Sequence, residues 1–212
     1  MEKSAGWLDY WVDPKTWRFR GDFEGMYRDF EDPWFCQRRN DFLERQVVLQ
    51  ILRDRHYQRI LDVGCGLGGF TEILRKATDA EFVCGIDVSS TAIGKASAKY
   101  DGCQFKIADI RRDAIPLVAE GLYDLVMLQE VIWYILPELS DVFAKIGQSM
   151  TDEGILFIEQ CFPSEQKFGK EFLQSADELI SRYLMPGGFK VLMHYRQILE
   201  GEMVLLLKLE KG

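Results

Sequence analysis

The sequence lacks the patterns that mark several common classes of enzyme. Histidine occurs only twice, and neither an H-E-x-x-H pair nor a G-x-S-x-G string is present, so there is no zinc-protease or serine-hydrolase signature. The five cysteines are odd in number and form no C-x-x-C pair, which fits neither a disulfide framework nor a zinc site. We therefore expect no bound metal and a reducing, cytoplasmic location.

Positive charge and long apolar runs are also scarce. Lys and Arg total 26 against 34 Asp and Glu, which argues against duplex nucleic acid, because such binding depends on basic side chains that neutralise phosphates. No apolar run approaches the roughly 20 residues of a bilayer span, and the first residues lack the apolar core of a signal peptide. The expected partner is a small molecule, with no nucleic acid and no membrane, and the chain is expected to be a monomer or homodimer.

What is present from about residue 57 onward is an alternation of short apolar runs with helical patterns. This rhythm is typical of βαβ units, in which helices cover both faces of a parallel sheet. Strands are expected at residues 59–64, 81–87, 103–109, 123–129 and 154–160. Helices are expected at residues 70–77, 90–100, 137–149 and 165–183.

The pattern changes after Pro186, where two glycines follow. Two extended runs, residues 189–199 and 202–210, are separated by little more than Glu200 and Gly201, which predicts an antiparallel hairpin. Five βα steps followed by a hairpin is not how a dinucleotide-binding half-fold ends. We predict an α/β fold with a seven-stranded, mostly parallel sheet, an antiparallel C-terminal hairpin and helices on both faces.

A glycine-rich loop, LDVGCGLGG at residues 61–69, joins the first predicted strand to the helix after it. Glycine lets a backbone turn tightly and approach a ligand closely, and the helix N-terminus behind the loop presents unpaired N–H groups. Gly64, Gly66 and Gly69 satisfy the G-x-G-x-x-G pattern of dinucleotide binding. Taken alone, the loop therefore indicates a nucleotide-like ligand and does not identify it.

Two further carboxylates stand at the ends of predicted strands. Asp87 closes the second strand, where a carboxylate can accept both hydroxyls of a ribose, and Asp109 closes the third. Asp62 precedes the first glycine by two residues and suits a cationic ligand better than a pyrophosphate, which it would repel. The residues alone leave open that Asp87 and Asp109 only form turns or helix caps.

Three segments, ILDVGCGLGGFTEIL, GIDVS and YDLVMLQEVIWYI, are together similar to the class I S-adenosylmethionine-dependent methyltransferases, from Tyr57 to the C-terminus. The glycine loop also satisfies the D-x-G-x-G form of their first motif, and the order of elements resembles their Rossmann-like sheet. The E-V-x-x-Y-I string at residues 130–135, with D-P-W at residues 32–34, resembles the N-methyltransferases of nodulation-factor synthesis and related sugar or amine methyltransferases.

The resemblance implies S-adenosylmethionine as the cofactor and gives individual residues a role toward it. Gly64, Cys65 and Gly66 would contact the methionine part, Asp87 the ribose, Asp109 and Ile110 the adenine, and the backbone carbonyl of Gln129 the methionine ammonium. Asp62, Gly68 and Val88 are the further cofactor-binding candidates.

The chemistry of such a transfer makes few demands on catalytic side chains. Methyl transfer from a sulfonium is an in-line displacement, so the protein mainly has to align the reactants and exclude water. An oxygen nucleophile requires a general base, whereas an amine needs only to arrive neutral. The candidate catalytic residues are Glu130, Tyr134 and His194. A tyrosine of this kind is also typical of packing, and a lone histidine is usually structural.

Residues 1–56 form an N-terminal segment, distinct from a methyltransferase domain at residues 57–212, because they concentrate the aromatic side chains. A helix is expected at residues 37–55. We expect parts of residues 7–35 to fold over the cofactor and form the acceptor pocket; the alternative is that these aromatics pack on the sheet or form a dimer face. The proposed lid and substrate residues are Trp7, Trp11, Trp17, Tyr27, Trp34 and Trp133.

The expected function is transfer of a methyl group to nitrogen or oxygen of a small molecule, such as a sugar or an amine. One alternative is a nicotinamide-dependent oxidoreductase, which the glycine pattern permits but which explains neither Asp109 nor the terminal hairpin. The other is a non-catalytic cofactor-binding or interaction protein on the same fold, with the aromatic segment as its partner surface.

Overall fold

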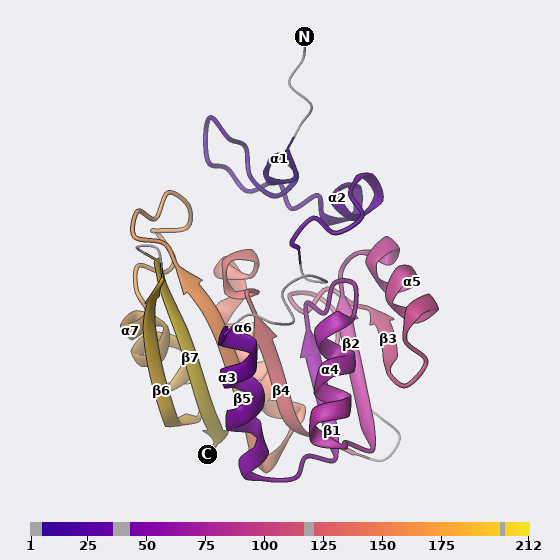
Figure 1. Ribbon diagram of the computed structural model, residues 1–212. Helices are drawn as coiled ribbons and strands as arrows, with labels where there is room; N and C mark the ends of the chain where they lie inside the picture. Colours follow the sequence, from indigo (N-terminus) through magenta and orange to yellow (C-terminus); the bar gives the residue numbers. More distant parts are fainter. Residues whose placement is uncertain (1–5, 36–42, 117–120, 200–201) are drawn as a thin grey trace.

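The computed structural model describes residues 6–35, 43–116, 121–199 and 202–212. Within these residues, seven strands form one sheet in the order β3-β2-β1-β4-β5-β7-β6 (Figure 1). Neighbouring strands are parallel from β3 across to β5, and β7 runs antiparallel to both β5 and β6. This arrangement confirms the predicted mostly parallel sheet with an antiparallel C-terminal hairpin.

The elements follow one another closely along the chain. The strands are β1 (Arg59–Val63), β2 (Phe82–Asp87), β3 (Gln104–Ile107), β4 (Tyr123–Gln129), β5 (Met150–Phe162), β6 (Phe189–Leu199) and β7 (Glu202–Lys211). The α-helices are α1 (Leu8–Trp11), α2 (Phe23–Asp29), α3 (Leu43–Ile51), α4 (Gly69–Thr78), α5 (Ser90–Lys99), α6 (Leu139–Gln148) and α7 (Ala176–Glu178). Short 3-10 helices η2 (Leu52–Asp54), η3 (Ile132–Tyr134) and η4 (Leu136–Glu138) and the π-helical turn η5 (Leu179–Leu184) complete the set.

Helices cover both faces of the sheet, which explains why β4 is apolar along nearly its whole length. Leu125 and Met127 pack on one face with residues of α3 and α4, whereas Val126 and Leu128 pack on the other with residues of α6 and η5. A strand buried on both faces has no reason to alternate apolar with polar residues. Helix α3 shares the first of these two cores, so the chain before residue 57 contributes to the packing of the sheet.

The predicted helix at residues 165–183 is wrong for most of its length. The chain is irregular through Ser175, whose side chain accepts a hydrogen bond from the N–H of Glu178 and starts α7. Gly169 has a φ of +74°, and a Cβ there would lie 2.1 Å from Leu136, so the loop turns sharply where it packs on the core. The predicted helix at residues 37–55 is represented by α3 and η2; residues 37–42 lie outside the described chain.

Gly68 illustrates how the glycine loop is fitted into the fold. It precedes α4 with a φ of +73°, and a Cβ there would lie 2.7 Å from the ring of Phe105 in β3 and 3.0 Å from Ala96 in α5. Only glycine combines this backbone conformation with so close an approach of a strand and a helix. Gly94, by contrast, lies inside α5, is exposed, and has no atom within 4 Å of an added Cβ.

We expect Gly68→Ala to lower the free energy of unfolding by about 1–3 kcal/mol, because it adds both backbone strain and overpacking. Gly94→Ala is the matched control, and we expect it to raise that free energy by up to about 1 kcal/mol because alanine favours an exposed helix interior. Urea unfolding followed by circular dichroism measures both. Two variants of equal stability would contradict the packing role given to Gly68.

Candidate active site

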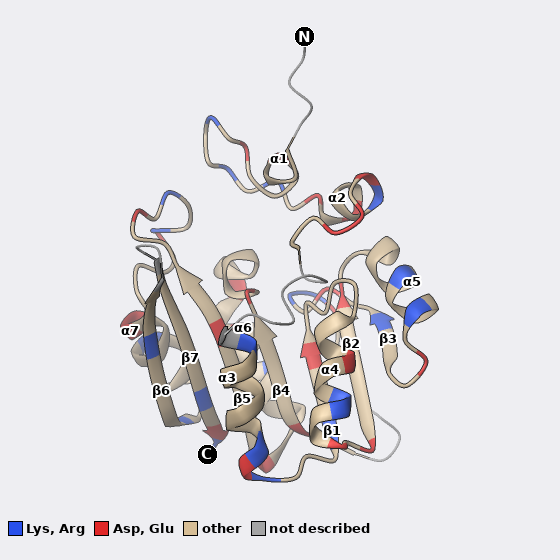
Figure 2. Ribbon diagram, in the orientation of Figure 1, with Lys and Arg blue, Asp and Glu red and all other residues tan. Residues whose placement is uncertain are grey.

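A cavity of about 840 Å³ lies at the carboxyl ends of β1, β2 and β4. Helices α1 and α2 lie above this edge of the sheet (Figure 1), and Figure 2 shows acidic residues along the edge below them. Asp62, Asp87 and Asp109, from the ends of β1, β2 and the loop after β3, all line the cavity. The side chains that the sequence pattern singled out are therefore brought to one place.

The glycine loop follows β1 and is fastened to the end of β2. The N–H groups of Gly64 and Cys65 donate to the carbonyl of Ile86 at 2.8 and 3.0 Å. Gly64 and Gly66 have φ values of +72° and +52°, and an added Cβ would lie 2.6 Å from Val131 and 2.6 Å from the Tyr27 hydroxyl, respectively. The loop can pass between these neighbours only because it carries no side chains at the two positions.

Asp87 holds the loop and the next helix together. Its Oδ2 accepts from the N–H of Gly66 and its Oδ1 from the N–H of Ser89, both at 2.9 Å. Burial raises the pKa of this carboxyl, whereas the two backbone donors favour its charged form. A carboxylate oxygen can accept more than one hydrogen bond, so both Asp87 oxygens can also receive a hydroxyl from a ligand in the cavity.

Asp62 is the most completely buried of the three acids. Its Oδ2 accepts from the Thr71 hydroxyl at 2.6 Å, and its side chain faces the cavity beside the glycine loop. Burial raises its pKa to about 6, and the neighbouring Asp87 acts in the same direction, whereas Thr71 and Arg45 lower it. A buried carboxylate of this kind gains most from a cationic group placed against it.

Asp109 occupies a different electrostatic environment. Arg111 donates to both of its oxygens, Nε to Oδ1 at 2.9 Å and Nη2 to Oδ2 at 2.8 Å, and this pairing lowers the pKa of the carboxyl. Ile110 beside it is buried and also lines the cavity. A ligand amino group would therefore share the Asp109 oxygens with a guanidinium.

The cavity also contains a basic side chain, Arg45, that the sequence pattern did not single out. Arg45 of α3 is 5% exposed, and its guanidinium stacks 5.1 Å from the Phe70 ring centre and donates to Gln129 Oε1 at 3.5 Å. Gln129 Nε2 in turn donates to Glu159 Oε2 of β5 at 2.6 Å. Arginine in an amphipathic helix is usually a surface residue, so nothing in the sequence distinguished Arg45 from its neighbours.

The three candidate catalytic residues differ in their placement. Glu130 follows β4 with a φ of +56°, and its carboxylate accepts from the Cys161 N–H at 2.8 Å and from Gln160 Nε2 at 2.7 Å. Both Glu130 and Tyr134 line the cavity. His194 does not: it is exposed on β6, the outer strand of the sheet, so we withdraw it as a catalytic candidate.

The N-terminal aromatic residues contribute part of the cavity wall. Trp7, Phe23, Tyr27 and Trp34 line it together with Tyr134. The Trp7 and Trp34 ring centres are 4.6 Å apart, and Phe23 and Tyr134 are 5.0 Å apart, in edge-on contacts that favour a fixed arrangement. These residues form a continuous aromatic wall above the strand ends.

Other residues expected near the ligands lie outside the cavity lining. Trp11 packs behind the wall against Tyr134. Trp17 is exposed beneath the ammonium of Lys167, and Trp133 donates its ring N–H to the Cys161 carbonyl. Gly68 is absent from the lining because it packs against β3 and α5, whereas the remaining cofactor candidates, including Cys65 and Val88, are present.

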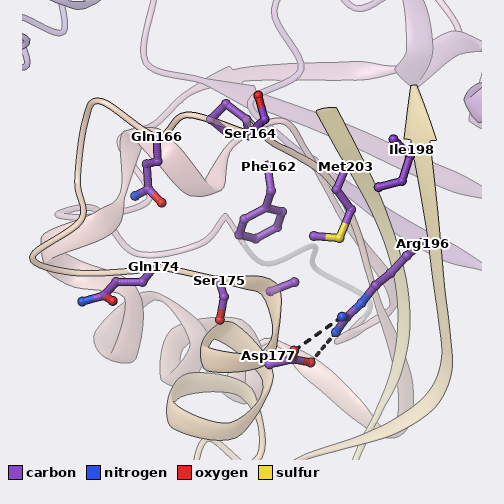
Figure 3. A pocket seen from close by; sticks show the side chains of 11 residues that line it. Phe162, Ser164, Gln166, Gln174, Ser175, Asp177, Arg196, Ile198 and Met203 are labelled. Atoms are coloured by element: carbon purple, nitrogen blue, oxygen red, sulfur yellow. Dashed lines mark hydrogen bonds and ion pairs between the residues drawn. The ribbon is translucent and has the colours of Figure 1, made fainter. Parts of the chain in front are cut away.

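A smaller hollow of about 320 Å³ lies beside β6 and the loop after β5 (Figure 3). Phe162 and Met203 supply apolar surface there, and Arg196 pairs with Asp177 at its edge. It contains neither the glycine loop nor the strand-end acids, so the larger cavity is the candidate active site.

The described part of the chain shows neither a cluster of metal-binding side chains nor a helix suited to crossing a membrane. No group of three or more His, Cys, Asp or Glu side chains is placed to hold a metal ion among those residues. Over the same stretches, no helix combines the length and the apolar character that crossing a bilayer requires.

Comparison with known proteins agrees with this geometry. The family described as "Methyltransferase domain" matches residues 55–196, more than half of the chain. This chain therefore belongs to the methyltransferase-domain family, which confirms the resemblance seen in the glycine loop and the strand ends. The match favours a methyltransferase over the nicotinamide-dependent alternative.

Among curated relatives, the chain is 29% identical to a trans-aconitate 2-methyltransferase of Rhizobium etli over 134 residues, which are 63% of this chain and 48% of the relative. It is 28% identical to a putative methyltransferase of Geobacillus over 129 residues, 58% of this chain and 51% of that protein. The chain thus spans about half the length of these relatives.

Solved structures with the same fold include the N-methyltransferase NodS from Bradyrhizobium japonicum in complex with S-adenosylhomocysteine. The TM-score is 0.66 at 18% identity, over 86% of this chain and 93% of NodS. The magnesium protoporphyrin IX methyltransferase of Synechocystis, also with S-adenosylhomocysteine bound, gives a TM-score of 0.61 at 20% identity over 79% of this chain and 81% of that one. At these identities the likeness concerns the fold.

The raised pKa of Asp62 predicts a pH-dependent stability. Its native pKa of about 6 exceeds the ordinary 3.8, so the native state retains a proton that the unfolded state has lost between these values. The free energy of unfolding therefore falls as pH rises from about 3.8 to about 6. Above this range the buried charge of Asp62 destabilises the native state by its full amount. We expect Asp62→Asn to raise the free energy of unfolding by about 1–3 kcal/mol near pH ~7.5 and by much less near pH ~4.

Denaturant unfolding of the ligand-free chain at the two pH values tests this expectation. Asp101→Asn, which removes an exposed carboxylate, is the control and should change stability little at either pH. A stability gain for Asp62→Asn that is equal at both pH values would show that burial of charge is not its cause.

Proposed function

We propose that this chain is a class I S-adenosylmethionine-dependent methyltransferase that acts on nitrogen or oxygen of a small molecule. The observation that carries the proposal is the convergence of Asp62, Asp87 and Asp109 around one glycine loop in one cavity. Membership of the methyltransferase-domain family supports it. S-adenosylmethionine would supply a methyl group on a positively charged sulfur.

The residues that line the cavity fit the chemical groups of this cofactor. The two Asp87 oxygens can receive the ribose hydroxyls. Ile110 offers an apolar surface for a purine ring and Asp109 an acceptor for its amino group. Asp62 suits the cationic part of the cofactor, and the carboxyl end of β4 brings the Gln129 backbone to the same end of the cavity.

Arg45 would complete this end of the site by binding the methionine carboxylate. Its neighbours include Phe70 in the first turn of α4, Gln129 at the tip of β4, and Asp62, whose pKa it lowers. All three belong to the elements around the glycine loop. An arginine fork pairs well with a carboxylate, so Arg45 and Asp62 together suit an amino acid in its zwitterionic form.

The protein's part in the reaction would be alignment and exclusion of water. Tyr134 and the aromatic wall would hold the acceptor above the strand ends and shield the reacting atoms. Glu130 would orient an acceptor amine or hydroxyl, since its carboxylate is fixed by the Cys161 N–H and Gln160. An amine acceptor needs no base once it arrives neutral.

The relatives support a small-molecule acceptor. The relative from Rhizobium etli is named as a trans-aconitate 2-methyltransferase, and the fold is shared with the N-methyltransferase NodS. A sugar or an amine remains our expectation for the acceptor class, and the aromatic side chains that line the cavity offer ring faces against which an acceptor could pack.

We expect S-adenosylmethionine and S-adenosylhomocysteine to raise the melting temperature of the chain, because a ligand that binds the native state stabilises it. NADH should not. Asp87→Ala should abolish the shift, with Asp101→Ala as the control and circular dichroism as the check on folding. Stabilisation by NADH alone would retire the methyltransferase proposal, and an unchanged shift in Asp87→Ala would remove the ribose assignment.

Arg45 is tested with two ligands that differ by the amino-acid part. Arg45→Gln should weaken S-adenosylhomocysteine roughly 10-fold or more, as expected for a lost charged hydrogen bond. It should leave 5′-methylthioadenosine, which lacks that part, unchanged. Arg53→Gln, which alters an exposed arginine of η2, is the matched control for calorimetric titrations. Equal losses for both ligands would show that Arg45 acts on the fold of the site and not on a carboxylate.

A further inference from the structure

Helix α2 is fastened to the start of α5 by one carboxylate. Glu24 Oε2 accepts from the Ser89 hydroxyl at 2.7 Å and from the Thr91 N–H at 3.1 Å. Glu24 Oε1 accepts from the Thr91 hydroxyl at 2.5 Å and from the Ser90 hydroxyl at 3.2 Å. Thus one side chain of α2 receives four hydrogen bonds from three consecutive residues, and these bonds hold the pKa of Glu24 down at about 2.

The opposite end of α2 is held by α5 as well. Lys95 Nζ donates to the Tyr27 carbonyl at 2.6 Å, and Met26 between the two attachments is fully buried. An isolated helix of seven residues has little stability of its own, because nucleation costs more than so few hydrogen bonds return. The position of α2 therefore depends on its contacts with α5.

The same turn that binds Glu24 also carries the candidate ribose acid. The Ser89 N–H donates to Asp87 Oδ1, and the Ser89 hydroxyl donates to Glu24. The Tyr27 hydroxyl of α2 lies against Gly66, whose N–H donates to Asp87 Oδ2. Asp87 and Glu24 are thus linked through the glycine loop, the turn and α2 in a closed set of contacts.

Residues from both sides of this attachment line one cavity. Phe23 and Tyr27 come from α2, and Asp87 and Val88 come from the end of β2. A nucleoside bound at Asp87 would contact both sets. Displacement of α2 would remove the contacts that Phe23 and Tyr27 make with the nucleoside. Without the nucleoside, α2 would in turn be held by fewer contacts.

We propose that Glu24 is a positioning residue. It couples the packing of α2 against α5 to the binding of a nucleoside at the part of the cavity formed by Asp87 and Val88, which we call the nucleoside end. The proposal rests on the function proposed above. Such coupling is reciprocal. The bound cofactor therefore stabilises the packing of α2 against α5 by the same free energy by which packed α2 strengthens cofactor binding. Glu24 does not contact the reacting atoms, and its effect passes through the position of Phe23 and Tyr27.

The first test measures ligand affinity in Glu24→Gln, which keeps the shape of the side chain and removes its charge. We expect S-adenosylhomocysteine to bind about 5–30-fold more weakly, mainly through faster dissociation in stopped-flow measurements. The loss should be equal for 5′-methylthioadenosine, because the coupling acts at the nucleoside end. Equal losses of affinity for the two ligands would also distinguish Glu24→Gln from Arg45→Gln, which should weaken S-adenosylhomocysteine alone. Glu31→Gln, an exposed glutamate just beyond α2, is the control.

The second test reports the position of α2 directly. In the wild-type chain, S-adenosylhomocysteine should slow hydrogen exchange of the α2 amides and of the glycine loop. In Glu24→Gln, bound ligand should still protect the glycine loop but not α2. Thr91→Val, which removes one donor hydroxyl and leaves Glu24 intact, should change affinity in the same direction by a smaller factor, about 2–5-fold.

The outcomes distinguish this inference from the function on which it rests. Wild-type affinity in Glu24→Gln, or ligand protection of α2 that survives the substitution, would overturn the coupling alone. A wild-type chain that binds neither S-adenosylhomocysteine nor 5′-methylthioadenosine would overturn the proposed function and the coupling with it.

Discussion

The carboxylate of Asp87 is the contact on which the cavity depends. It stands at the end of β2 and receives one N–H from the glycine loop after β1 and another from the turn before α5. Loss of the acceptor would leave buried donors without partners, which costs more than the hydrogen bonds themselves contribute. One side chain thus ties the glycine loop, 21 residues earlier in the chain, to the end of β2 and to the turn that follows it, and the other lining residues are arranged around this point.

Burial of acidic groups gives this site its chemical character. Asp62 and Asp87 are both held where water is largely excluded, and each carries a raised pKa. A site of this kind is less stable without a ligand than an apolar one would be, and a cationic ligand relieves the conflict. Arg45, placed beside Asp62, limits the excess of negative charge and adds a partner for an anionic group. The cavity is thereby suited to a molecule with both charges at one end.

Much of the fold could be predicted from sequence because strands buried on both faces and a terminal hairpin leave clear patterns. The run at β4 and the glycine loop are examples, since each has a local physical cause. The helix expected at residues 165–183 failed because Gly169 turns the chain against Leu136, a contact that no local pattern reveals.

Only part of the candidate site could be predicted, because the sequence shows local patterns but not contacts between distant elements. Asp62 and Asp87 were expected to lie close together because strand ends converge in any parallel sheet, and both line the cavity. The roles proposed for Arg45 and Glu24 leave no signal in the sequence because their partners lie on other elements: Gln129 in one case and the turn around Ser89 in the other. His194 was misplaced because a histidine on an outer strand looks the same in sequence as one that faces a cavity.

The position of β7 has a consequence for how the molecule acquires its structure. In the described sheet β6 is hydrogen-bonded to β7 alone, and β7 separates it from β5. During synthesis β6 emerges before the strand that must lie between it and the rest of the sheet. Until β7 arrives, the open edge of β5 is available to any passing strand, so this edge is where the nascent chain most needs protection from association with other chains.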